Sequence, residues 1–144
     1  MQRIKGSIGY VEYAYALQNK MNAARRRIPR NRSSNFVEPG ETSFKAAAAN
    51  AQWDKAPGFY EILTDEPGKE SWPISGATFI LMHKMQEDAA TAREVLKFFD
   101  WAYANGGKLA SELDYVPLPE NVQNLIRKAW KDQIRDTSGS SLTK

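Results

Sequence analysis

The chain of 144 residues contains no cysteine, and its only histidine is His83. Without cysteine it can form no disulfide framework, no thiolate metal site and no cysteine nucleophile. Long apolar runs are also missing: the longest, residues 77–82, has the length of a strand, whereas a membrane-spanning helix needs roughly 20 apolar residues. We therefore expect no membrane insertion.

The chain also has only a small excess of positive charge. The net charge is +3 at pH 7, which does not by itself indicate a nucleic-acid partner. Hydrophobic residues make up 42% and charged residues 26%, the composition of a globular domain with a core of its own. Residues 1–6 begin with basic character, but no continuous apolar stretch follows. We therefore expect no signal peptide in this chain, and an export signal would lie on other residues.

The patterns that carry catalysis or anion binding are weak. His83 follows a predicted buried strand without a cysteine or a close carboxylate pair, so a structural histidine is favoured over a catalytic one. Residues 6–9 only superficially resemble a nucleophile elbow, because the serine directly follows the first glycine and a strand comes next. Residues 75–78 lead into a strand instead of a helix N-terminus, which favours a turn over an anion site. We predict no catalytic residue, no metal ligand and no cofactor, and hence no enzyme.

Hydrophobic periodicity predicts an α/β protein in which helices alternate with few strands. The segment at 77–83 is the most apolar of the predicted strands and is expected to be buried on both faces. Three strands are too few for a stand-alone doubly wound sheet, and their open edges would need partners. The predicted strands are residues 8–11, 60–64 and 77–83, and the predicted helices are residues 12–21, a segment after 42 with Phe44, Ala47, Ala48 and Ala51 on one stripe, 89–105 and 119–131.

Several local features refine this outline. The pair Gly106-Gly107 predicts a left-handed end for the helix at 89–105. Trp101 and Trp130 are expected in the core. Trp72 precedes a proline and is a candidate anchor for a crossover of the chain. The Ser/Gly-rich tail, residues 137–144, is expected to fray.

The segment Arg25–Arg32 carries five arginines in eight residues and is the one feature that suggests nucleic acid. Such a cluster could contact phosphates, which keeps a small basic nucleic-acid-binding module as the alternative function. However, no aromatic residue interrupts the cluster and no DNA-binding motif surrounds it. An exposed, solvated loop is the favoured interpretation.

Four segments together resemble the phosphate-binding proteins of the Pst-type ABC transport system. The resemblance extends over about residues 2–136, and the segments occur in the family's order and spacing. The segments are GSIGYVEYAYA at 6–16, SWPISGATFILMHK at 71–84, EVLKFFDWAY at 94–103 and LDYVPLP at 113–119.

This resemblance implies the C-terminal part of a longer, two-lobed periplasmic-binding-protein fold of type II, with incomplete sheets. Residues 1–66 would finish the second lobe, and residues 67–144 would complete the first. The family binds inorganic phosphate between its lobes and delivers it to a membrane permease from the periplasm. Its phosphate-binding motifs lie upstream of Gly6, so the resemblance places no ligand-binding residue in this chain. We expect this chain alone to bind phosphate weakly or not at all.

Overall fold

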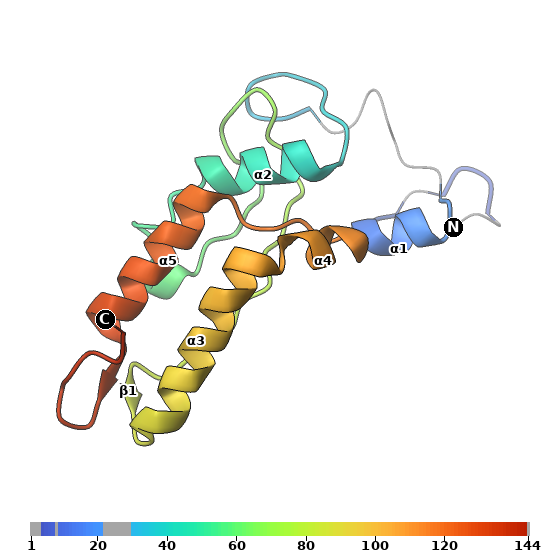
Figure 1. The fold of residues 1–144 in the computed structure, drawn as a ribbon. Helices are drawn as coiled ribbons and strands as arrows, with labels where there is room; N and C mark the ends of the chain where they lie inside the picture. The colour runs from blue at the N-terminus through green and yellow to red at the C-terminus, as the bar shows by residue number, and fades with distance from the viewer. Residues whose placement is uncertain (1–3, 8, 22–29, 144) are drawn as a thin grey trace.

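A computed structural model describes residues 4–7, 9–21 and 30–143 (Figure 1). Helices are the main regular structure of these residues, and the strands are short. The elements in chain order are α1 (Tyr13–Gln18), α2 (Glu41–Asn50), a 3-10 turn (Pro57–Phe59), β1 (Met85–Gln86), α3 (Ala89–Asn105), α4 (Gly107–Glu112), α5 (Glu120–Gln133) and β2 (Arg135–Asp136).

Helix α2 confirms the helix predicted after residue 42. The backbone N–H of Gly40 donates to the Ser43 Oγ at 3.1 Å, so this hydroxyl caps the first turn. Ala47 and Ala48 are buried, as their spacing predicts. Trp53 lies just beyond the helix, and its Nε1 donates to the Ala48 carbonyl at 2.7 Å. The first core cluster joins α2 to α5 and consists of Ala48, Trp53, Leu63 and Val122.

Helix α3 confirms the prediction for residues 89–105. It begins at Asp88, whose carboxylate accepts from the N–H groups of Ala90 and Thr91 at 3.0 and 3.1 Å. The predicted left-handed end is wrong, because Gly106 has φ −80° and the chain continues directly into α4. A Cβ at Gly106 would lie 2.6 Å from the Ala102 carbonyl oxygen, so close backbone approach requires this glycine.

A second core cluster lies between the N-terminal half of α3 and the chain end. It consists of Ala92, Leu96, Ile134 and Leu142. The predicted fraying of residues 137–144 is wrong up to residue 143, because burial of Leu142 holds the tail. The Asp136 carboxylate also accepts from the backbone N–H groups of Ser138 and Ser140 at 2.9 Å each, which folds the chain back.

None of the three predicted strands forms a ladder in the described residues. Residues 9–11 form no strand, and residue 8 lies outside the described part of the chain. From the segment 60–64, only Thr64 takes part in pairing, through one antiparallel bridge to Ile74. Residues 77–83 are extended but unpaired, and Leu81 is 94% exposed. Sheet structure needs neighbouring strands, and the described parts of the chain offer none to this segment.

The architecture is therefore a mixed helix and strand arrangement with an open sheet, whose one ladder is the parallel pair β1–β2. The prediction that residues 77–83 are buried on both faces is wrong, because residues 78–81 and 83 are exposed and only Ala77 and Met82 pack on the core clusters. Figure 1 shows the chain passing behind α3 on its way to β1. None of the described helices is long and apolar enough to cross a bilayer.

Candidate functional site

Side chains suited to catalysis or metal binding do not converge in the part of the chain that the structure describes. No group of three histidine or acidic side chains within it could hold a metal ion. His83 is exposed, so its predicted place at the end of a buried strand is wrong. The tryptophan prediction is half right, since Trp130 is partly buried whereas Trp101 is 54% exposed.

The arginine-rich segment is described from Arg30 onward, and residues 25–29 lie outside the described part. Arg30 donates to the Ser34 carbonyl at 3.2 Å, and the Arg32 Nε lies 3.7 Å from the Asp65 carboxylate. Both arginines are exposed, which confirms the solvated interpretation for these two residues. Arg30 thus bonds within its own loop, whereas Arg32 pairs with a carboxylate 33 residues further along the chain.

Asn31 is buried beside these exposed arginines and organises a turn far away in the sequence. Its Nδ2 lies 3.2, 2.9 and 3.2 Å from the carbonyl oxygens of Gly68, Lys69 and Ser71. Its Oδ1 accepts from the Asn35 N–H at 3.0 Å. We call these contacts the Asn31 clamp. Sequence reasoning missed it, because an asparagine in a polar loop carries no signal that distinguishes a buried clamp from a solvated side chain.

Ser71 completes the other side of the clamped turn. It is fully buried, and its Oγ donates to the Pro67 carbonyl at 2.5 Å and accepts from the Asn50 Nδ2 at 3.2 Å. Gly68 has φ +111°, and a Cβ there would lie 2.4 Å from the Asn50 Nδ2. Only glycine fits this combination of left-handed backbone and close contact. Residues 67–71 therefore form a tight turn that requires glycine at position 68.

The loop around this turn closes on itself and is fixed to α2. The Asp65 N–H donates to the Pro73 carbonyl at 2.9 Å, and the Ser75 N–H donates to the Leu63 carbonyl at 3.3 Å. The Trp72 N–H donates to the Ser43 carbonyl at 3.0 Å. Trp72 therefore anchors the returning chain on α2, at the place where sequence analysis suggested an anchor.

A polar cleft of about 430 Å³ lies beside this loop. Arg32 and Lys55 line it together with the carboxylates of Glu61, Asp65 and Glu66. Glu66 is largely buried, and this burial, assisted by the negative charge of Glu61, raises the pKa of its carboxyl group. Three carboxylates against two cations make the cleft a poor receptor for an anion such as phosphate.

The Glu66 carboxyl predicts a pH dependence of stability. Its folded-state pKa is raised, so its ionisation opposes folding, and stability falls as pH rises from its unfolded pKa through its folded pKa. Glu66→Gln should therefore unfold at higher denaturant concentration than wild type at pH 7, and the advantage should vanish at pH 4. Urea titrations at the two pH values, with exposed Glu94→Gln as control, measure this. An equal advantage at both pH values would contradict it.

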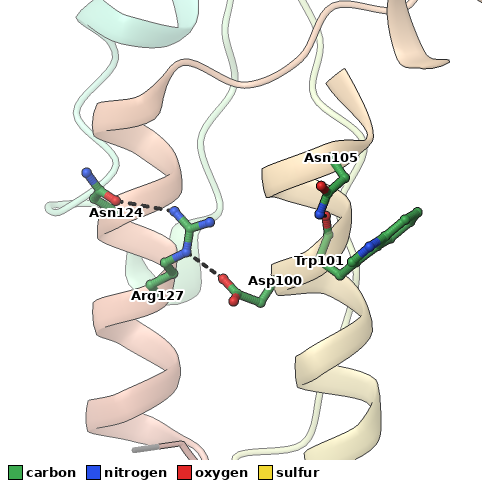
Figure 2. A network of polar contacts seen from close by, with 5 residues as sticks. All are labelled: Asp100, Trp101, Asn105, Asn124 and Arg127. Carbon is green, nitrogen blue, oxygen red and sulfur yellow. Dashed lines mark hydrogen bonds and ion pairs between the residues drawn. The ribbon is translucent and has the colours of Figure 1, made fainter. Parts of the chain in front are cut away.

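Helices α3 and α5 are joined by a polar network on their facing sides (Figure 2). The Arg127 Nε lies 2.7 Å from the Asp100 carboxylate, and its Nη1 lies 3.3 Å from the Asn124 Oδ1. The Arg127 guanidinium also lies 5.8 Å from the centre of the Tyr103 ring, which stacks on Trp130. Burial raises the pKa of the Tyr103 hydroxyl. These side chains fix the spacing of α3 and α5.

The open segment itself, defined as residues 76–82, is the most unusual surface of the molecule. In the described part of the chain, none of its backbone N–H or C=O groups has a hydrogen-bond partner. Ile80 and Leu81 are 59% and 94% exposed. A backbone of this length without partners is a template for strand pairing.

Comparison with known proteins finds relatives that are much longer than this chain. No protein-family profile matches the chain. It is 49% identical over 142 residues, 99% of its length, to "Phosphate-binding protein PstS" of Pasteurella multocida, and 44% identical over 135 residues, 94% of its length, to the protein of the same name in Haemophilus influenzae. The match covers the C-terminal part of these PstS proteins. It spans 40% of the length of each of these two relatives.

PstS-like sequence also occurs within much larger proteins. A mimivirus protein whose name includes serine/threonine-protein kinase/receptor is 30% identical over 133 residues, but the match covers 8% of that protein. Most of that protein lies outside the matched region, so its kinase name says nothing about this chain. The PstS relatives are named for binding, which agrees with the prediction that this chain is not an enzyme.

Proposed function

We propose that this chain is the C-terminal part of a protein that binds inorganic phosphate and delivers it to an ABC-type phosphate importer. The observation that carries this proposal is the 44–49% identity to PstS proteins along 94–99% of the chain. Such identity over nearly the whole chain accords with the four segments that first suggested the family. The protein would act in the periplasm, with the permease of the importer as its partner.

The phosphate ligands would come from the remaining part of the PstS protein. Tight anion binding needs several convergent donors in a site with little water. In the described part of this chain, three buried side chains already donate to the backbone: Asn31 to the Lys69 carbonyl, Ser43 to the Glu38 carbonyl, and Ser71 to the Pro67 carbonyl. These groups are therefore committed to the fold, and none is left to hold a phosphate oxygen.

We further propose that the chain contributes to both lobes of a type II binding-protein fold. Residues 1–66 would belong to the second lobe and residues 67–144 to the first. The closed loop supports this division, because the clamped turn at 67–71 lies at the boundary. The open segment would then be an interior strand of the first lobe, covered on its faces by α3 and α5.

The alternative of a nucleic-acid-binding module has no support from the relatives. Of its arginines, Arg30 and Arg32 are engaged with Ser34 and Asp65. A surface loop whose arginines pair within the protein accounts for both residues.

A chimera tests the proposal. This chain replaces the matching C-terminal 40% of the Pasteurella multocida PstS protein, and phosphate is titrated in by calorimetry. If the chain supplies a compatible part of the fold and the ligands lie elsewhere, the chimera should bind phosphate within about tenfold of the unmodified relative, a difference of about 1.4 kcal/mol. A chimera that folds, by circular dichroism, but shows no heat of phosphate binding would overturn the proposal.

A further inference from the structure

The polar cleft beside the clamped loop has walls that this chain itself holds in place. It measures about 430 Å³, and side chains from residues 52–67 line it together with Arg32. The Lys55 N–H donates to the Gln52 carbonyl at 3.0 Å, which turns the first part of this wall. The Asp65 N–H donates to the Pro73 carbonyl at 2.9 Å and fixes the last part. The cleft is therefore formed by hydrogen bonds within the described residues.

Glu66 is buried in the wall of this cleft without a partner. The residue is only 8% exposed, yet its carboxylate makes no hydrogen bond or ion pair with any described residue. Among the described residues, the one fully enclosed side-chain atom without a partner is the Thr143 Oγ1, so the Glu66 oxygens keep contact with the cleft. The nearby Arg32 pairs with Asp65 instead, at 3.7 Å. A buried carboxylate normally has a donor, and the position of that donor here is the cleft itself.

The charges around the cleft favour one small cation. Glu61, Asp65 and Glu66 bring three negative charges against the two positive charges of Arg32 and Lys55, a net charge of −1. No group of three histidine or acidic side chains in the described residues could hold a metal ion, which leaves an organic monocation. A primary ammonium group carries three N–H donors on a compact, strongly hydrated charge. It therefore suits a polar cleft better than the flat and weakly hydrated guanidinium group does.

We infer that this cleft is a binding site for a primary ammonium group, with the Glu66 carboxylate as the main acceptor and the Glu61 carboxylate as the second negative charge. A free alkylamine and a lysine side chain of another polypeptide present this same chemistry. The bound ammonium would supply the hydrogen-bond donor that the fold does not give to Glu66. The inference does not rest on phosphate binding.

Butylamine is the probe that tests this site. Titrated into the 144-residue chain at pH 7 and constant ionic strength, it should shift the amide NMR signals of residues 60–67 to saturation, with a dissociation constant of about 1 mM. Tetramethylammonium carries the same charge without an N–H donor and should bind at least about tenfold more weakly.

Three variants assign the roles of the side chains. Glu66→Gln should weaken butylamine binding about tenfold, and its folding is secure because this variant is expected to be more stable than wild type at pH 7. Lys55→Gln removes a competing cation from the cleft and should tighten binding several-fold. Glu94→Gln is the matched control, since its exposed carboxylate lies on α3 and pairs with Lys97, and its affinity should equal that of wild type.

Shifts that rise without saturation, equal affinity for tetramethylammonium, or wild-type affinity in Glu66→Gln would each overturn the inference. A capped Gly-Lys-Gly peptide distinguishes the two sources of the ammonium group. Tighter binding than butylamine assigns the site to a lysine of a polypeptide, and weaker binding assigns it to a free amine. Phosphate binding by the chimera is measured separately, so the failure of either proposal is distinguishable from the failure of the other.

Discussion

Replacing Trp53 with alanine should lower the free energy of unfolding by about 4 kcal/mol, as expected for truncation of a large buried aromatic residue. Trp53 is 4% exposed and packs with Ala48, Leu63 and Val122, so it joins α2, the chain after it and α5. Truncation removes apolar contact and leaves a cavity. It also leaves the Ala48 carbonyl without the indole donor at 2.7 Å.

Urea denaturation followed by circular dichroism measures this loss without using tryptophan fluorescence. Trp101→Ala is the matched control, because that side chain is 54% exposed, and we expect it to cost less than about 1 kcal/mol. Trp53→Phe keeps most of the volume and should fall between the two. A loss for Trp53→Ala no larger than that for Trp101→Ala would mean that the first core cluster does not hold α2 to α5.

Replacing Asn31 with alanine should cost about 3 kcal/mol, because it removes a buried hydrogen bond to the Ser71 carbonyl and three partly buried ones. The carbonyls of Gly68, Lys69 and Ser71 would lose a shared donor, and the Asn35 N–H would lose its acceptor. The effect should be local as well as global. Hydrogen exchange should accelerate at the Asn35 amide and at the Ser71 amide, which bonds within the clamped turn.

Asn105→Ala provides the control for this substitution. The Asn105 side chain is exposed and makes one bond, to the Trp101 carbonyl at 3.0 Å (Figure 2). Its removal should change stability by less than about 0.5 kcal/mol. If Asn31→Ala were equally mild and exchange at Asn35 stayed slow, water would be replacing the clamp and Asn31 would not organise the turn.

The helices could be predicted from sequence because their determinants are local. The stripe with Ala47 and Ala48 and the cap at Asp88 lie within a few residues of the helices they specify. Gly106 was misjudged because two different reasons favour glycine at a helix end. A left-handed turn was expected, and close contact with the Ala102 carbonyl was found.

Strands and buried polar contacts depend on partners distant in sequence, and there the prediction failed. Residues 77–83 have a strand-forming sequence, yet a ladder requires neighbours that the described chain does not provide. Asn31 acts on a turn 37 to 40 residues away, which no local pattern reveals. The family resemblance predicted more than hydrophobic periodicity did, because a resemblance compares whole segments of sequence, whereas periodicity describes one element at a time.

Calorimetric titration of inorganic phosphate into the purified 144-residue chain tests the central claim most directly. The account predicts no heat of specific binding with phosphate at millimolar concentration, because the buried side chains of Asn31, Ser43 and Ser71 serve the fold and the proposed ligands lie in the rest of the PstS protein. A dissociation constant in the micromolar range or tighter would contradict it, since a complete phosphate site would then exist within these residues.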